Sequence, residues 1–178
     1  MLPYMSNATD SALDSTSLPE INYDQVYQFD LTSQVKFWKL PQEEVFELFR
    51  DGRTASRFLE RMVPRLFADF KYVDEKGYDW LRKMIEKVEG KCVTKNGCKF
   101  APSAMVGSGR KIIPEEVKEH IEDNNLDYIL MDIVEFPLVR MRFVKGSDLI
   151  ATHPNCDISK AKKWRTKYFN VWFIWKIV

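Results

Sequence analysis

The sequence predicts a mixed β-sheet with helices packed on it, a fold of the α/β or α+β class. Two helical stretches come first, and strand-like segments then stand on both sides of a further helix, an order typical of such folds. At 178 residues, 45% of them hydrophobic, the chain is long enough for one domain with a hydrophobic core. We see no internal repeat and no linker, so we expect a single domain over residues 21–178.

Two helices are expected in the first third of this domain. Residues 41–50 begin with proline followed by acidic residues, both of which are favoured in the first helical turn. Asp51 and Gly52 interrupt this helix. A second helix is expected from about residue 54 or 56 to residue 70, because apolar side chains recur there at four-residue steps on one face: Phe58, Met62 and Leu66.

Strands are expected in the rest of the domain, with one short helix between them. Residues 71–100 are rich in β-branched and aromatic residues and contain the turn signal Lys95-Asn96-Gly97, although residues 81–88 also fit a helix. Pro114 opens a helix that ends at the Asn124-Asn125 pair. Two strands follow, 127–136 and 138–146, of which the first is apolar on both faces and the second alternates basic and apolar residues. The predicted order is helix, helix, strand, strand, helix, strand, strand.

Charge is unevenly placed along the chain, although the net charge is only +1. Residues 1–30 contain five acidic residues and no Lys or Arg, and we expect residues 1–20 to form a flexible acidic arm. The remaining chain has 27 Lys and Arg against 21 Asp and Glu. A basic body suits a partner that carries phosphates, and an ordinary solvated surface is the alternative.

Cysteine usage and hydropathy indicate an intracellular protein. The three cysteines are odd in number and form no CxxC pair, so no disulfide framework is implied. A zinc site at Cys92 and Cys98 needs two further ligands. The longest apolar run, residues 171–175, is too short to span a bilayer, and the N-terminus lacks a secretory signal pattern. We therefore expect a cytoplasmic protein with no membrane contact.

The candidate catalytic groups are carboxylates near a lysine, because no GxSxG, Cys–His or P-loop pattern is present. Hydrolysis of a phosphodiester bond needs a divalent cation, and Mg²⁺ prefers carboxylate oxygens. An acid two residues before a lysine on one strand puts both side chains on one face, about 6.6 Å apart along the strand. A nearby lysine can stabilise the negative charge that develops during the reaction.

Three places in the chain have this acid-x-Lys spacing. The pattern at Glu116 lies on the expected helix, where positions two apart diverge by about 200°, and that at Asp74 lies in a polar turn. Glu89-Gly90-Lys91 lies in the best strand candidate, ten residues after Asp79. A salt-bridge ladder on an exposed strand is the alternative interpretation of this match.

The stretch GYDWLRKMIEKVEGKCV resembles the PD-(D/E)XK nuclease superfamily, and most of all type II restriction endonucleases. A second matching element is SRFLE, which places Glu60 on the helix before the hairpin. The resemblance covers roughly residues 54–145 and implies a restriction-endonuclease-like mixed sheet flanked by helices. It implies Asp79 and Glu89 as metal ligands, Lys91 as the catalytic lysine, Glu60 as an auxiliary acid, and Mg²⁺, with Mn²⁺ as a substitute, as cofactor. Tyr78 replaces the proline that gives the motif its name, which lowers its specificity.

Basic residues after the hairpin are candidates for DNA binding. Backbone N–H groups of the loop 101–111 can approach phosphates, or this loop simply connects a strand to a helix. Arg140 and Arg142 share a strand face and can contact DNA, or pair with Glu135 or Asp132. The run 159–169 interleaves basic and aromatic residues, as a surface that follows a nucleic-acid backbone does. The full set of candidates is Lys95, Lys99, Arg110, Lys111, Arg140, Arg142, Lys163 and Arg165.

These residues together predict a Mg²⁺-dependent endonuclease that hydrolyses phosphodiester bonds of double-stranded DNA, with sequence specificity. We expect a homodimer, because a domain with one site cuts one strand and two-fold symmetry matches a palindromic duplex. A non-catalytic module that binds nucleic acid or protein, and an RNA-cleaving nuclease, are the alternatives.

Overall fold

In the computed structural model, the residues described here are 21–23, 25–36, 39–102, 105, 111–158, 165, 168–169 and 174–177. The expected N-terminal arm and most of the run 159–169 lie outside them. The described elements, in chain order, are β1 (Val26–Asp30), α1 (Gln42–Phe49), α2 (Gly52–Leu66), β2 (Phe70–Glu75), β3 (Tyr78–Arg82), β4 (Glu86–Val93), β5 (Cys98–Lys99), α3 (Pro114–Asn124), β6 (Asp127–Asp132), β7 (Leu138–Lys145), α4 (Gly146–Thr152), β8 (Asp157–Ile158) and β9 (Ile174–Ile177).

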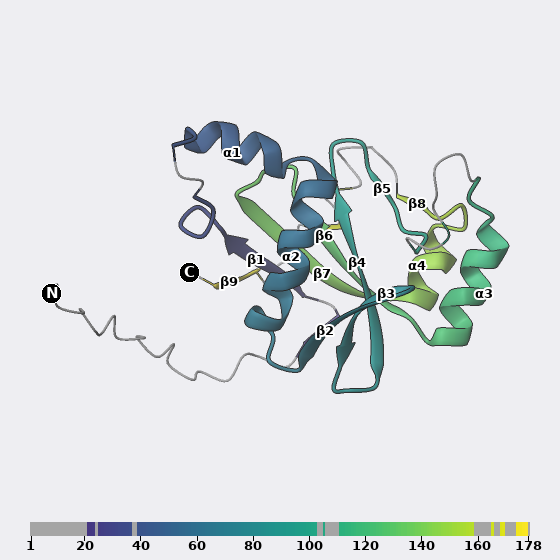
Figure 1. Ribbon diagram of the computed structural model, residues 1–178. Coiled ribbons are helices and arrows are strands. Elements are labelled where there is room, and N and C mark those ends of the chain that lie inside the picture. The colour runs from purple at the N-terminus through teal and green to yellow at the C-terminus, as the bar shows by residue number, and fades with distance from the viewer. Residues whose placement is uncertain are drawn as a thin grey trace, which may run out of the picture.

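A seven-stranded sheet in the order β2-β3-β4-β6-β7-β1-β9 forms the centre of the molecule (Figure 1). Strands β2, β3 and β4 form an antiparallel meander, and α3 then carries the chain to β6, which pairs with β4 in parallel. The other parallel pair described is β1 with β9, while β5 and β8 form a separate two-stranded sheet. The predicted mixed sheet with packed helices is confirmed.

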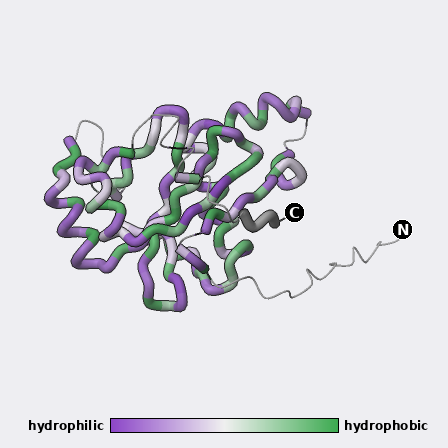
Figure 2. Tube along the Cα trace, turned by 180° about the vertical axis from the view of Figure 1, so that it is seen from behind, coloured by the Kyte–Doolittle hydropathy of each residue, from purple (hydrophilic) through white to green (hydrophobic). Residues whose placement is uncertain are grey.

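Two hydrophobic cores lie on the two faces of this sheet. Helices α1 and α2 pack on one face, where Leu59 and Val63 meet Trp80 and other strand residues. Helices α3 and α4 pack on the other face, where Ile121 and Leu149 join a second cluster. Figure 2 shows why the helices suit this role, since hydrophilic and hydrophobic residues alternate along their turns. No helix in the described part of the chain is long and apolar enough to cross a membrane.

The helix boundaries follow from local chemistry. The break expected at Asp51-Gly52 is a helix cap, because the Asp51 side chain accepts hydrogen bonds from the N–H groups of Arg53 and Thr54. Helix α2 therefore starts at Gly52, slightly earlier than predicted. It also ends earlier, at Leu66, because Phe67 is extended and the next strand begins at Phe70.

The main difference from the predicted order is that four strands, not two, lie between α2 and α3, the fourth being the short β5. Residues 70–93 form three strands, and the region that also fitted a helix contains the tight turn between β3 and β4. Lys83 and Met84 occupy this turn with φ values of 48° and 68°, a conformation usually taken by Gly or Asn. The turn was therefore not visible in the sequence. Strand β1 was also missed, and β6 ends at Asp132 rather than at residue 136.

Candidate active site

The candidate site lies on the β3–β4 hairpin. Asp79 is in β3, and Glu89 and Lys91 are in the neighbouring strand β4. The antiparallel pairing Trp80↔Val88 continues by one step to place Asp79 opposite Glu89. Glu89 and Lys91 lie on one face, as alternation predicts, and the Lys91 Nζ is 2.5 Å from the Glu89 Oε1. The hairpin thus brings the three predicted residues together.

Gly90 fixes how closely the two strands approach at this point. The Asp79 Oδ2 accepts a hydrogen bond from the Gly90 N–H at 2.7 Å, so the carboxylate replaces a ladder contact where regular pairing ends. A Cβ at Gly90 would be 2.5 Å from the Trp80 ring and 3.1 Å from the Met131 Cε. Glycine is therefore required between the acid and the lysine, because the Trp80 indole fills the space of a side chain.

A proline in α2 connects Glu60 to the same hairpin. Pro64 has no N–H, so the Glu60 carbonyl, four residues earlier, is left without its usual helical donor. The Trp80 Nε1 donates to this carbonyl at 2.9 Å. The helix is thereby attached to the residue next to Asp79, and the Glu60 carboxylate lies close enough to Asp79 to raise its pKa.

The site has more negative than positive charge. The pKa of Asp79 is raised to about 7, first by burial and then by the charge of Glu89, with a smaller contribution from Glu60. The Gly90 N–H and Lys91 act in the opposite direction. The Glu89 residue is only 3% exposed. Asp79 therefore carries the influence of two further acids, Glu89 and Glu60, with Lys91 as the one cation among these residues, and a bound cation would stabilise its charged form.

Asp79 and Glu89 are the residues best placed to hold a metal ion. Mg²⁺ usually takes one or two protein carboxylates and keeps several waters, so two acids are enough. Within the described ranges, no group of three or more His, Cys, Asp and Glu side chains is arranged around a common metal position. Cys92 and Cys98 are free thiols, and burial raises the pKa of both, to about 12 for Cys98, which keeps them protonated at neutral pH.

The predicted DNA-binding residues fall into three groups. Lys95, Lys99 and Lys111 are exposed, and their DNA contacts stay a prediction. Arg110 and Lys163 lie outside the described residues. Arg140 forms the ion pairs that were the alternative to a DNA contact, with Glu135 at 3.0 Å and with Asp132 at 3.6 Å. Arg165 contacts the same two acids, at 3.1 and 3.8 Å.

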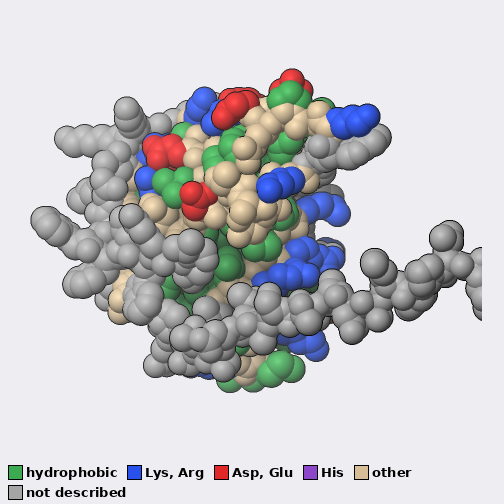
Figure 3. Space-filling model, turned by 90° about the vertical axis from the view of Figure 1, so that its left-hand side faces the viewer, with side chains coloured by type: hydrophobic (Ala, Val, Ile, Leu, Met, Phe, Trp, Pro, Cys, Tyr) green, Lys and Arg blue, Asp and Glu red, His purple; other side chains and the backbone are tan. Residues whose placement is uncertain are grey.

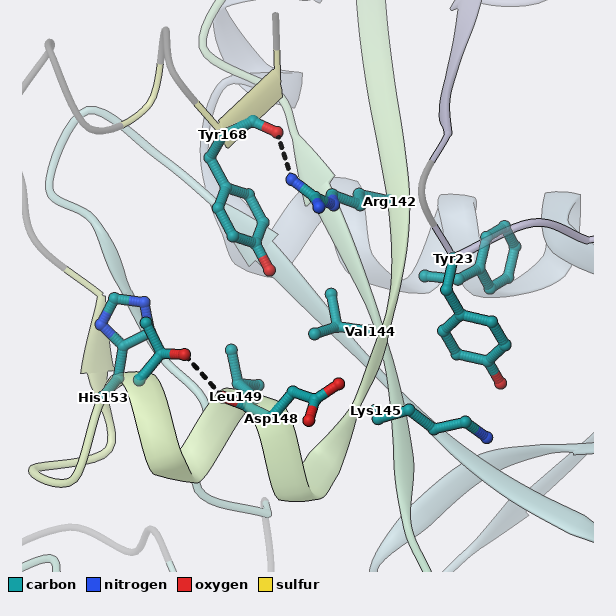
Figure 4. A pocket seen from close by; sticks show the side chains of 10 residues that line it. Tyr23, Arg142, Val144, Lys145, Asp148, Leu149, His153 and Tyr168 are labelled. Carbon is teal, nitrogen blue, oxygen red and sulfur yellow. Dashed lines mark hydrogen bonds between the residues drawn. The ribbon is translucent and has the colours of Figure 1, made fainter. Parts of the chain in front are cut away.

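Arg142 forms no ion pair with Glu135 or Asp132 among the contacts described, and instead it lines a cavity of about 190 Å³ between β7 and α4 (Figure 4). Its Nη1 donates to the Tyr168 carbonyl at 2.9 Å, and its guanidinium lies 4.3 Å from the centre of the Tyr168 ring. Tyr168 and Asp148 point into the cavity from opposite sides in this view. Three of the four arginines predicted to contact DNA are thus held by intramolecular contacts, which their sequence positions alone did not determine.

No protein family, curated protein or solved structure matches the chain in the comparisons with known proteins. Function is therefore inferred from the side chains of the site itself. That site consists of Asp79, Glu89 and Lys91 on one hairpin and Glu60 on the adjacent helix. Sequence reasoning missed Pro64 and Trp80, which position Glu60, because their contact joins residues that lie far apart in the chain.

Proposed function

We propose that this chain is a Mg²⁺-dependent endonuclease that hydrolyses phosphodiester bonds of double-stranded DNA, with the restriction-endonuclease-like fold of the PD-(D/E)XK superfamily. The observation that carries the proposal is the convergence of Asp79, Glu89 and Lys91 on one hairpin, with Glu60 of α2 near Asp79. The surrounding elements support it, because α2, the β2–β4 meander, α3 and the parallel strand β6 follow in the order that the resemblance implies.

Each residue has a role that follows from its position. Asp79 and Glu89 would hold the metal ion, which, when bound, neutralises phosphoryl charge and lowers the pKa of a water. Lys91, held beside Glu89, can donate a hydrogen bond to the phosphoryl oxygens as negative charge develops on them. Glu60 adds negative charge on the side of α2 and can orient a water.

Cleavage of mixed-sequence duplex DNA by the purified chain tests the proposal. With Mg²⁺ we expect nicked and then linear plasmid, and with EDTA no cleavage. Lys91→Ala should abolish cleavage, whereas Lys87→Ala should retain it. Lys87 is a matched control because it lies on the same face of β4 but donates to the Asn124 Oδ1 at 2.7 Å instead of to the site.

The same assay distinguishes the alternatives. Preferred cleavage of RNA would indicate an RNA nuclease, and binding without cleavage would indicate a non-catalytic module. Equal loss of activity in the Lys87 and Lys91 variants would contradict the assigned role of Lys91. We further expect specific cut sites and a homodimer, which sequencing of the product ends and sedimentation of the DNA complex would test.

A further inference from the structure

Four arginines follow the outer side of α2 at four-residue steps, and we call them the arginine row: Arg53, Arg57, Arg61 and Arg65. All four are exposed, while Ala55, Leu59 and Val63 are buried against the sheet. Each step advances by about 6 Å and turns by about 40°, so the row is about 18 Å long and winds partly around the helix.

The arginine row has no compensating charge of its own. The structure gives none of its members an ion pair within the described residues, and the only acid in α2 is Glu60. The side-chain contacts described for the row are with neutral groups: the Arg65 Nη1 donates to the Arg61 carbonyl at 2.6 Å, and the Arg61 guanidinium lies 3.8 Å from the Tyr72 ring centre. Like charges four residues apart destabilise a helix. An external anion would remove this repulsion.

The other long helices carry the opposite charge. Helix α1 has three acids and no basic residue, and α3 has five acids and one lysine. Basic charge on the described helices is thus concentrated in α2. Figure 3 shows Lys and Arg side chains gathered along one edge of the molecule, with the acidic side chains elsewhere on that face. A polyanion would be attracted to α2 and repelled from α3.

The row begins at the end of β4, the strand that carries Glu89 and Lys91. The N-terminus of α2 contacts the end of β4, because a Cβ at Gly52 would be 3.3 Å from the Thr94 Cγ2 and 3.6 Å from the Cys92 Cβ. The exposed Lys95 follows in the next turn. Glu60 lies between Arg57 and Arg61 in the sequence. A nucleic acid bound along the outer side of α2 would therefore lie near the end of β4 and close to Lys95.

We propose that the arginine row binds the phosphate backbone of duplex DNA beside the cleavage site. Guanidinium groups bind phosphates in a bidentate manner and without regard to base sequence. At about 3.4 Å of axial rise for each phosphate on one strand, the row spans about five phosphates. The choice of DNA as the polyanion rests on the proposed function, while the row itself rests on charge and geometry.

Binding of a labelled mixed-sequence 20-base-pair duplex in EDTA tests the row without any catalysis. The variant is Arg53→Gln with Arg57→Gln. It leaves Arg61 and Arg65 in place, because their side chains have described contacts within the protein. We expect at least roughly fivefold weaker binding, and a salt dependence of log Kd that is shallower by about 1.8, since each phosphate contact contributes about 0.9. The matched control is Lys36→Gln with Lys118→Gln, two exposed lysines that are not part of α2, which should leave the slope unchanged.

An unchanged slope in the arginine variant, or an equal change in the control, would overturn the row. The proposal would also fail if the variant lost binding to anionic phospholipid vesicles but kept its affinity for DNA. A wild-type chain that binds DNA through the row but never cleaves it would contradict the proposed function alone. Cleavage that is normal in the arginine variant at all salt concentrations would contradict the row alone. Circular dichroism and thermal unfolding verify that both variants fold.

Discussion

Two clusters of charged side chains lie on the sheet, and they differ in charge balance. The site cluster (Glu60, Asp79, Glu89, Lys91) has three acids and one lysine. The β6–β7 cluster (Asp132, Glu135, Arg140, Arg165) has two acids and two arginines, and each arginine contacts both acids. Glu89 and Asp132 are nearly equally buried, at 3% and 2% exposure.

The difference separates a structural cluster from a candidate catalytic one. Burial of a charge is costly unless the charge is paired, and the β6–β7 cluster places two arginines against its two acids, although burial still raises the pKa of Asp132. The site cluster does not, so its remaining negative charge calls for a cation from outside. The comparison also accounts for the basic residues: arginines near Asp132 are used within the fold, whereas those on α2 stay available for a partner.

Asp79→Asn should have the largest effect on function. We expect cleavage in Mg²⁺ to fall by about 10²–10³-fold, because one contributor to the electrostatics of the transition state is lost. DNA binding should be kept or become tighter, since a carboxylate that faces phosphate is removed. Initial rates and duplex affinity measure the two effects.

Asp132→Asn is the control from the balanced cluster, and its cleavage rate per folded molecule should stay near that of the wild type. If Asp79→Asn lost DNA affinity in parallel with activity, its role as a metal ligand would be contradicted. A fall of similar size in Asp132→Asn would remove the distinction between the two clusters.

Arg140→Ala should have the largest effect on stability. It leaves buried Asp132 with Arg165 as its remaining cationic partner in the cluster, and the free energy of unfolding should fall by about 2–3 kcal/mol, less than for a fully buried pair. Urea denaturation at pH 7 measures the change. Arg57→Ala, at an exposed position without an ion pair, should change stability by less than about 0.5 kcal/mol. Equal stability of the two variants would show that the β6–β7 cluster contributes no net stability.

The parts of the fold that depend on local chemistry could be predicted from the sequence. Pro41 and Pro114 indicated the starts of α1 and α3, and the Asn124-Asn125 pair indicated the end of α3. Alternation along β4 was enough to place Glu89 and Lys91 on one face. These features need only neighbouring residues, so a single sequence contains them.

The parts that depend on contacts between distant segments could not be predicted in the same way. The closeness of Asp79 and Glu89 requires the hairpin whose turn is formed by Lys83 and Met84, residues that give no turn signal. Arg140 pairs with Asp132 because the register of β6 and β7 places these two residues opposite each other, and the sequence alone does not give that register. The arginine row was not identified from the sequence, and it is the exposure of all four residues in the structure that makes it a surface.

In EDTA, Asp79→Asn should stabilise the protein at pH 8. Its pKa of about 7 in the folded state lies above the unfolded value of 3.8, so the folded state holds the proton longer and loses stability as pH rises between these values. The amide removes this loss and keeps an oxygen for the Gly90 N–H. We expect a gain of about 1–2 kcal/mol at pH 8 after allowance for solvent screening, and almost none at pH 3.5. A gain that is independent of pH would contradict this explanation.

Binding of Mg²⁺ should produce a small increase in stability, and this increase should distinguish the site cluster from the β6–β7 cluster. For a dissociation constant near 1 mM, 10 mM Mg²⁺ stabilises the folded state by about 1.4 kcal/mol, or about 3–6 °C in Tm. We expect this shift in the wild type and in Asp132→Asn, but not in Asp79→Asn. NaCl at equal ionic strength controls for screening of the arginine row. If Asp79→Asn keeps the full shift, the cation binds elsewhere; if only Asp132→Asn loses it, the cation belongs to the β6–β7 cluster and the charge argument is wrong.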